Sequence, residues 1–438
     1  YEVGGFSAFI DGRQNVPVNE VIDLEDYRLR HSHYKLDDDL RLLHQNYPFI
    51  TVWDDHEFAN NAWMGGADNH NPGEGEWSDR KANAWQSYFE WMPIREMEGN
   101  IIHRATEYGD LIKFYLLDTR IEHRDEQVGI GSNQVNSPDR TILGDVQKEW
   151  LEDELIASEA HWNICAQQVM MAPLTAFGLE LNTDQWDGYV MDRNWLYNIV
   201  QAFVPNFVVL TGDIHTSWVN NLPLDNYNNN QQIGSVGVEF VCTSVTSQAL
   251  PIDLGEGLIQ ILNPHVQFVN LQKKGYILLD VTPQRVQGDW MFMNTVQTST
   301  LGESVGASYR VYDQTKFAAV ADFPIQPQPG ACLMAPQWPF DPSTVNVPND
   351  INLTLISAYP NPTNDKVVIQ FALQSESGLA IELFDLSGKA VGVPVTLHPQ
   401  RGLHYAQLDL QNLAAGTYVL SIKTNEEAKS SLIVKAPR

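Results

Sequence analysis

Short, unbroken apolar runs recur through the first 323 residues and constrain the fold more than any other feature of the sequence. Such runs predict strands that are buried on both faces. They are Phe49–Trp53, Leu111–Leu117, Asn163–Val169, Phe207–Thr211, Val238–Val241 and Tyr276–Val281. Helical patterns lie between some of them, at Val146–Leu155 and Asp192–Phe203. The alternation predicts an α/β sandwich whose sheet is covered on both faces.

The pattern of the chain changes after residue 323. Residues 324–350 contain seven prolines, a density that supports no regular element and predicts a stiff linker. Residues 351–438 then show short strand patterns separated by turns, which predict a small all-β, immunoglobulin-like sandwich. These patterns are Val367–Leu373, Ala380–Leu386, His404–Leu410 and Thr417–Lys423. We therefore expect one domain over residues 1–323, a linker over 324–350 and a second domain over 351–438.

The chain is acidic, with 55 Asp and Glu residues against 27 Lys and Arg residues and a formal net charge of −28. It has no cluster of basic residues, so we expect no general nucleic-acid binding. Acidity can keep an exported protein soluble. It is also compatible with an enzyme for phosphate esters whose bound metal ions offset the repulsion. No run of about 18 apolar residues is present, so we expect no transmembrane segment.

Two clusters of ionisable residues follow predicted strands. Trp53-Asp54-Asp55-His56-Glu57 follows the first run, and Gly212-Asp213-Ile214-His215 follows the fourth. Ligands of open α/β sheets gather beyond the carboxyl ends of strands, and charged residues are costly to bury there without partners. If the second segment is extended, Asp213 and His215 point to the same side and can reach one ion. For the first cluster, the alternative is a solvated loop of mixed charge.

The residue types in these clusters favour a metal centre. Carboxylate and imidazole ligands suit iron, manganese, zinc or calcium, and the three cysteines show no metal-ligand spacing. Two metal ions about 3.5–4 Å apart can hold phosphoryl oxygens and generate hydroxide for in-line attack. Arg120 is a candidate for binding a phosphate oxygen, but a structural ion pair with Asp118 explains it equally well. Arg28 and Arg30 raise the same alternatives, and the sequence does not choose among the three arginines.

Longer motifs carry a resemblance to a known family. The runs ITVWDDHEFANN, YGDLIKFYLLDTR, DQWDGYVMDR and VVLTGDIHTSW are similar to those of the alkaline phosphatase D (PhoD-like) metallophosphoesterases, and the likeness covers nearly all of residues 1–293. The resemblance implies a calcineurin-like metallophosphoesterase sandwich with a dinuclear or multinuclear centre of Fe(III) and Ca²⁺. It also implies that Asp55, Asp213 and His215 are metal ligands and that His56 faces the phosphate and donates a proton.

The same family has an upstream G-D-x-x-Y-E segment, whose Asp bridges the metals and whose Tyr binds iron. This chain opens with Tyr1-Glu2, which resembles the tail of that segment, so the resemblance implies that Tyr1 is the iron ligand. The sequence begins at Tyr1 and therefore does not include the position of the bridging Asp. We therefore expect an N-terminally truncated chain with weak or absent activity.

The C-terminal residues resemble a second family, the C-terminal (Por) sorting domains of type IX secretion. The resemblance rests on Ala358–Pro362, the turn at Asp385–Gly388, Leu413–Tyr418 and a basic end near Lys435. It implies export across the outer membrane by the type IX secretion machinery, which acts through residues 351–438. A generic binding sandwich, such as a carbohydrate-binding module, is the alternative.

Together these features predict a secreted, metal-dependent alkaline phosphatase that hydrolyses phosphate esters with metal-activated water. Phosphodiesterase or phospholipase D-like activity of the same fold is one alternative, because the metals contact only the phosphoryl group. A non-catalytic surface protein that keeps the fold is another. We expect loops near residues 64–80 and 222–235 to shape the pocket for the leaving group.

Overall fold

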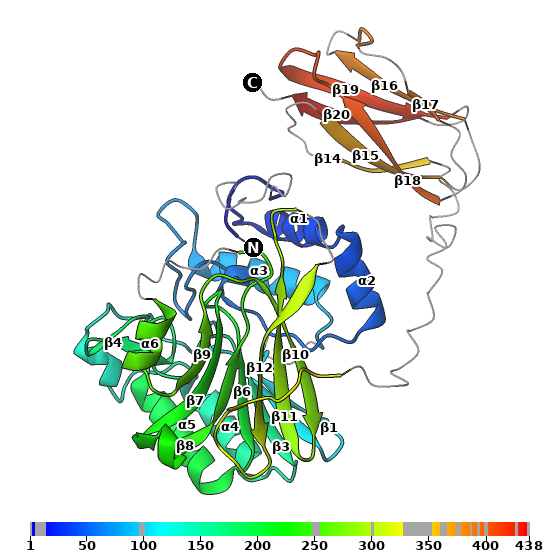
Figure 1. The fold of residues 1–438 in the computed structure, drawn as a ribbon. Helices are drawn as coiled ribbons and strands as arrows, with labels where there is room; N and C mark the ends of the chain where they lie inside the picture. Colours follow the sequence, from blue (N-terminus) through cyan, green and yellow to red (C-terminus); the bar gives the residue numbers. More distant parts are fainter. Residues whose placement is uncertain are drawn as a thin grey trace. The chain divides into compact units, whose positions relative to one another are not determined.

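The computed structural model divides the chain into two compact units, residues 1–331 and 332–438 (Figure 1). The structure describes residues 2–4, 15–95, 101–247, 255–298, 302–326, 353–359, 366–373, 378–385, 388–391, 395–397, 402–424 and 428–435. Tyr1, the proposed iron ligand, lies outside these residues, as does most of the predicted linker.

A mixed sheet forms the centre of the first unit. Within the described residues it has seven strands in the order β1-β2-β3-β6-β8-β7-β9. They are β1 (Arg104–Tyr108), β2 (Ile112–Leu116), β3 (Trp162–Ala166), β6 (Phe207–Thr211), β7 (Ser217–Asn228), β8 (Ile233–Val241) and β9 (Val266–Asn270). Strands β2, β3, β6 and β8 run parallel, whereas β1, β7 and β9 pair antiparallel with their neighbours.

A second sheet packs against one face of the first. Within the described residues it is antiparallel and has the order β10-β11-β12-β13. Its strands are β10 (Gly275–Thr282), β11 (Arg285–Met293), β12 (Glu303–Tyr312) and β13 (Ala319–Val320). Ile164, Val208 and Phe240 of the larger sheet share a buried core with Val286 and Trp290 of the smaller one. Burial of these apolar side chains holds the two sheets face to face.

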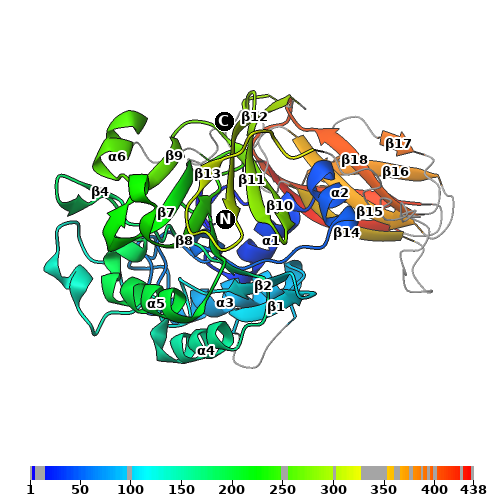
Figure 2. The ribbon, with the colours of Figure 1, turned by 60° about the horizontal axis from the view of Figure 1, so that its bottom comes forward.

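Helices cover the opposite face of the larger sheet. Successive residues of a strand point to opposite faces, so Cys165 and Val209 point away from the core that contains Ile164 and Val208. They pack instead with Leu151 and Leu196. These come from α4 (Gly144–Ile156) and α5 (Val190–Phe203). Figure 2 shows the resulting layers: the two helices, the larger sheet and then β10–β13. Because β3 and β6 are buried on both faces, their sequences read as unbroken apolar runs.

The remaining helices of this unit lie around the ends of the sheets. Figure 1 shows α1 (Leu24–Tyr34), α2 (Asp38–Asn46) and α3 (Trp77–Trp91) together at one end. Near the other edge are α6 (Glu256–Leu262) and the short hairpin of β4 (Thr175–Ala176) and β5 (Leu179–Glu180). The described residues of this unit also form short 3-10 helices, which are η2 (Asp55–Glu57), η4 (Asn133–Asn136), η5 (Trp186–Gly188) and η6 (Asn229–Gln231).

The second unit is built only from antiparallel pairs within its described residues. One sheet has the order β14-β15-β18 and the other β17-β16-β19-β20. The strands are β14 (Leu353–Tyr359), β15 (Lys366–Leu373), β16 (Leu379–Asp385), β17 (Val395–Leu397), β18 (Gly402–Asp409), β19 (Gly416–Lys423) and β20 (Ala428–Lys435). Phe371 of the first sheet and Leu420 of the second belong to one buried core.

One predicted strand is absent. Residues 49–53 form no strand, although Trp53 is fully buried. Their carbonyl oxygens accept hydrogen bonds from side chains instead: Arg104 Nη2 donates to the oxygen of Thr51 at 2.8 Å, and Gln168 Nε2 donates to that of Trp53 at 2.8 Å. The apolar run therefore reflects a buried segment in which side chains satisfy the backbone in place of a sheet ladder.

Candidate metal centre

The candidate site lies where the parallel strands of the larger sheet end. Arg120 follows β2, Gln168 follows β3, and Asp213 follows β6. Neighbouring parallel strands end at the same edge of a sheet, so three segments far apart in sequence are brought together here. The segment that begins at Trp53 joins them from outside the sheet. Trp53 Nε1 donates to Asp118 Oδ2 at 2.9 Å, which anchors this segment beside β2.

Hydrogen bonds between side chains and backbone fix the turn that carries Asp54 and Asp55. The side chain of Glu57 accepts a hydrogen bond from the Asp54 N–H at 2.6 Å, which closes the turn of η2. Asp55 is buried and accepts from the N–H groups of His56 and Asn61, both at 2.8 Å. A carboxylate that is fixed by backbone donors before any ligand binds loses little entropy on binding.

Asp213 and His215 do not lie on an extended segment, and this part of the sequence interpretation is wrong. Both have left-handed backbone conformations, with φ of 64° for Asp213 and 58° for His215. The i, i+2 rule for strands therefore does not apply to them. The backbone oxygen of His215 accepts hydrogen bonds from Thr243 Oγ1 at 2.9 Å and from Lys274 Nζ at 2.7 Å. Two non-glycine residues in this region within one short turn indicate local strain, which concentrates at functional sites.

Three carboxylates converge at this edge of the sheet. Asp54, Asp55 and Asp213 each offer an oxygen, and these oxygens all lie within 4.8 Å of one another. Asp55 and Asp213 are predicted ligands, whereas the sequence indicates no separate role for Asp54, although it belongs to the same motif. His215 is not a member of this group.

Arg120 occupies the centre of the acidic group and is fully buried. Its Nε donates to Asp54 Oδ1 at 2.7 Å, and its Nη2 donates to Asp213 Oδ1 at 2.5 Å. Its Nη1 donates to Asp184 Oδ2 at 2.7 Å, and Asp55 Oδ1 lies 3.8 Å from Nη2. Four carboxylates thus surround one guanidinium. Arg124 adds a second cation only at Asp184, so the group keeps an excess of negative charge.

The pKa values reflect this crowding. Burial, together with repulsion by Asp54 and Asp55, raises the pKa of Asp213 well above its ordinary value despite the attraction of Arg120. Burial would also raise the pKa of Asp55, but Arg120, His56 and two backbone N–H groups outweigh it and hold that pKa below its usual range. The carboxylates therefore differ in how readily they ionise when Arg120 is the main cation among them.

His56 lies beside the carboxylate group and is held by Glu2. Its Nδ1 lies 2.7 Å from Glu2 Oε2, and its side chain is 35% exposed. Burial lowers the pKa of His56, but Asp55 and Glu2 more than compensate and raise it to about 9. Glu2 is itself fixed, because the Asn60 N–H donates to its Oε1 at 2.8 Å. In the sequence, only the position of Glu2 in the Tyr1-Glu2 pair points to a role at the site.

The other two arginines have structural roles. Arg28 is paired with Glu90 at 2.7 and 2.5 Å at the surface. Arg30 is buried and donates to backbone oxygens of Val16 and Pro17 at 3.1 and 2.9 Å, among others. Of the three candidates, Arg120 is therefore the one that the fold brings to the carboxylates.

Comparison with known proteins identifies the family. The model of the PhoD-like phosphatases matches residues 3–290. The chain belongs to the PhoD-like phosphatase family. Alkaline phosphatase D of Bacillus subtilis (strain 168) is 38% identical over a 333-residue alignment that covers 70% of this chain and 55% of that protein. A solved structure of PhoD is 32% identical, with a TM-score of 0.64 over 73% of this chain and 64% of the other. The chain thus spans 55% to 64% of the length of these relatives, less than two thirds of each.

Family membership bears on the site and on the fold. The α/β unit with its mixed central sheet has the PhoD-like fold, and the family implies a metal centre. The group of Asp54, Asp55 and Asp213 fits such a centre, because carboxylate oxygens are ligands for hard cations and their negative charge exceeds that of Arg120.

The C-terminal unit determines where the protein goes. Residues 357–436 match the secretion system C-terminal sorting domain, so the protein is exported across the outer membrane to the surface or the medium. Among the described residues, no helix has both the length and the apolar character needed to cross a membrane.

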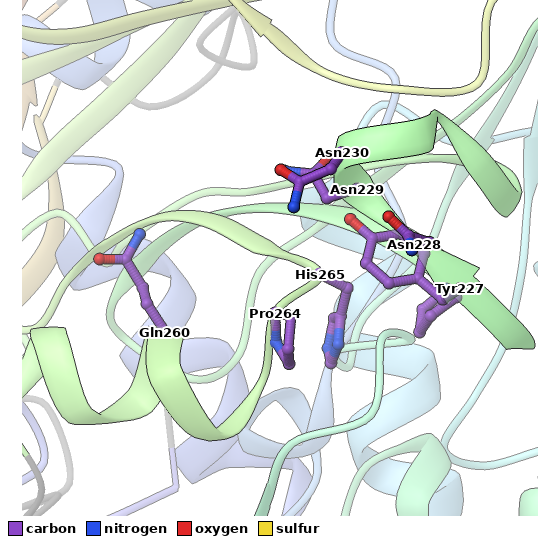
Figure 3. A pocket seen from close by; sticks show the side chains of 8 residues that line it. Tyr227, Asn228, Asn229, Asn230, Gln260, Pro264 and His265 are labelled. Carbon is purple, nitrogen blue, oxygen red and sulfur yellow. The ribbon is translucent and has the colours of Figure 1, made fainter.

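A separate hollow of about 620 Å³ lies away from this site. Figure 3 shows Gln260 on one side of it and Tyr227 and Asn228 on the other. Its lining residues are Pro223, Tyr227, Asn228, Asn229, Asn230, Gln260, Pro264 and His265. Asn229 Nδ2 donates to Gln267 Oε1 at 3.0 Å and Gln260 Nε2 to Gln267 O at 3.2 Å, so these two lining amides already hold the hairpin and α6 in place.

The length of the β7–β8 hairpin corrects the expectation that residues 222–235 shape the pocket for the leaving group. Trp218 pairs with Val241 near the candidate metal centre, and Asn228 pairs with Ile233 at the far end of the β7–β8 hairpin. Ten residues of strand separate these ends by about 30 Å. The hairpin tip therefore cannot shape a pocket at the metal centre. Residues 64–80 do approach it, because Asn69 Nδ2 donates to Glu2 Oε1 at 3.3 Å.

Proposed function

We propose that this protein is a secreted, metal-dependent phosphatase that hydrolyses phosphate esters. The observation that carries the proposal is the convergence of Asp54, Asp55 and Asp213 within 4.8 Å at the carboxyl ends of the sheet. Alkaline phosphatase D of Bacillus subtilis, 38% identical to this chain, supports the reaction class. The domain limits of 1–323, 324–350 and 351–438 are part of the same proposal.

The layered architecture supports a finer assignment of both units. Two sheets that pack face to face, with helices outside the larger one, agree with a calcineurin-like metallophosphoesterase sandwich. In the second unit, two antiparallel sheets around one core agree with an immunoglobulin-like sandwich that the type IX secretion machinery recognises.

We infer that Fe(III) and Ca²⁺ occupy the centre, with Asp55, Asp213, His215 and Tyr1 as ligands and Asp54 as a further one. The excess of carboxylates over guanidinium supports cations of high charge here. A bound metal centre supplies Lewis acidity toward the phosphoryl group and makes a water molecule acidic enough to attack at neutral pH.

The chain's own residues supply positioning and proton transfer. Glu2 fixes the ring of His56 through Nδ1, and the partly exposed ring lies beside Asp55, where it can protonate the departing alkoxide. Arg120 reaches a phosphate oxygen only if it releases one of its carboxylate partners. A cation bound to those carboxylates would allow that release, because it takes over their charge balance.

Turnover of three phosphate esters tests the reaction. We expect hydrolysis of p-nitrophenyl phosphate to exceed that of bis-p-nitrophenyl phosphate and of phosphatidylcholine, and a chelator to abolish it. Faster turnover of either diester would assign the protein to phosphodiesterase or phospholipase chemistry. If the metal-loaded protein hydrolyses none of the three esters, the result would contradict the proposal and favour the alternative of a non-catalytic surface protein.

Substitution of His56 tests the proton donor. His56→Ala should lower kcat by roughly 10²–10⁴, the scale of general acid catalysis. His161→Ala is a matched control, because His161 is also 35% exposed and lies 3.1 Å from a carboxylate, that of Asp313, but precedes β3 at the opposite edge of the sheet. An equal effect of the two substitutions on kcat would remove His56 from the mechanism.

A further inference from the structure

Gln168 is a buried residue that bonds the segments of Asp54, Arg120 and Asp213, the first two through its amide and the third through its backbone oxygen, and no motif assigns it a role. It lies two residues after the end of β3 and is 4% exposed. Its Nε2 donates to the backbone oxygen of Trp53 at 2.8 Å and to that of Leu117 at 2.9 Å. Its Oε1 accepts from the Thr119 N–H at 3.0 Å and from the Thr119 hydroxyl at 2.6 Å.

Both donors and both acceptor positions of this amide are therefore used. The backbone adds a further link, because the Gly212 N–H donates to the Gln168 oxygen at 3.1 Å. Each partner is next to, or close to, a residue of the site. Trp53 precedes Asp54, Thr119 precedes Arg120, and Gly212 precedes Asp213.

We propose that Gln168 is a positioning residue that sets the separation between the carboxylates of Asp54, Asp55 and Asp213. The proposal rests on the proposed metal centre and extends it to a residue that touches no ligand atom. The three segments come from different parts of the chain, and residues 49–53 have no sheet ladder to fix them. The Gln168 side chain ties the segments of Trp53 and Thr119 to the end of β3, and its backbone oxygen ties Gly212 to the same point. One residue thus keeps ligand positions within the narrow tolerance that metal coordination requires.

Two other buried glutamines nearby, Gln147 and Gln167, do not link the same three segments. Gln147 binds the backbone of Asp118 on both sides, through Oε1 and Nε2 at 2.8 Å each, and otherwise contacts its own helix. Gln167 contacts Thr211 and Trp186 but neither Trp53 nor Thr119. Gln168 alone, among these three, joins the segments of Asp54, Arg120 and Asp213.

Gln168→Met tests the proposal, because methionine has a similar volume and no polar groups to replace the bonds. The matched control is Asn163→Leu, which removes a buried amide from the other end of the same strand. Asn163 bonds Tyr115 and Pro205 at 2.8 and 3.0 Å and touches no residue of the site. Both substitutions leave buried backbone or hydroxyl groups unpaired, so both should lower the melting temperature.

Calcium binding to chelator-treated protein, measured by isothermal titration calorimetry, separates positioning from stability. We expect Gln168→Met to weaken Ca²⁺ binding by about 10–100-fold, the usual effect of losing a partner that orients metal ligands. Asn163→Leu should bind Ca²⁺ as the unchanged protein does. In the loaded enzyme, Gln168→Met should lower kcat with little change in KM. Equal Ca²⁺ affinities for the two variants would overturn the proposal.

Two further measurements keep the outcomes distinct. If Gln168→Met does not fold, Thr119→Val is the substitute, because it removes only the hydroxyl bond to Gln168. This variant should also weaken Ca²⁺ binding, by a smaller factor than Gln168→Met. Unchanged Ca²⁺ affinity would again overturn the proposal. If the unchanged protein binds Ca²⁺ but hydrolyses no ester, the proposed function fails while the affinities still decide the role of Gln168.

Discussion

At the scale of single residues, the charge balance around Arg120 governs the candidate metal centre. Its guanidinium is fully buried and donates to Asp54, Asp184 and Asp213. Removing one member of a buried ionic group leaves the others uncompensated, which costs more than the pair itself contributes. A metal ion at the same carboxylates would replace part of this compensation, so the effect of losing Arg120 depends on the metal.

Arg120→Met should lower the free energy of unfolding of the metal-free protein by about 3–5 kcal/mol. Added Ca²⁺ should restore more stability to this variant than to the unchanged protein. Urea unfolding in chelator and in excess Ca²⁺ measures both effects. Arg124→Met is the control, since Arg124 is also fully buried and pairs with Asp184 but not with the three converging carboxylates. Equal gains from Ca²⁺ in both variants would show that Arg120 and the cation do not share these carboxylates.

At the scale of elements, His265 ties the turn between α6 and β9 to the segment that follows β3. Its Nε2 donates to the backbone oxygen of Pro173 at 2.7 Å, and its side chain is buried. Burial is the main cause that lowers the pKa of His265, from 6.5 to about 4. The folded state therefore holds this ring neutral at pH values where the unfolded chain protonates it.

This shift predicts an acid-dependent loss of stability. Between pH 6.5 and about 4 the unfolded chain binds a proton at His265 that the folded chain does not, so stability falls as pH falls through this window and levels off below it. The loss amounts to roughly 3 kcal/mol. His265→Gln keeps a donor for Pro173 but does not titrate, so its stability should change less with pH. Urea midpoints from pH 7 to 4 compare the two proteins, and parallel curves would refute the assignment.

At the scale of the whole molecule, the two units have separate roles. The first unit contains the candidate metal centre, and the second contains the residues that match the sorting domain. Each has a buried core of its own. Export and hydrolysis should therefore separate genetically.

Deletion of residues 351–438 should leave the protein inside the producing cell without changing kcat per folded molecule. Cell fractionation together with a phosphatase assay on purified protein checks both parts. Continued export with lost adhesion to a carbohydrate matrix would instead identify the second unit as a binding module.

The elements that the sequence predicts well are those whose environment is uniform along their length. Strands β2, β3 and β6 are buried on both faces, and each reads as an apolar run. The sequence pattern does not predict the long strand β7, because this strand includes two buried asparagines. Asn220 Nδ2 donates to the fully buried Glu239 at 3.0 Å, and the Asn221 N–H donates to His265 O at 2.9 Å. Buried polar residues satisfied by distant partners leave no periodic signal.

The sequence by itself determined the family, the two classes of domain and the two acidic motifs, because these depend on local patterns. The tertiary structure alone decided which charges meet. It brought Glu2 to His56, Asp184 to Arg120 and Gln168 to Trp53, over separations of 54, 64 and 115 residues. Hydrogen bonds and ion pairs act over a few ångströms, so partners this distant in sequence meet only when the complete fold brings their segments together.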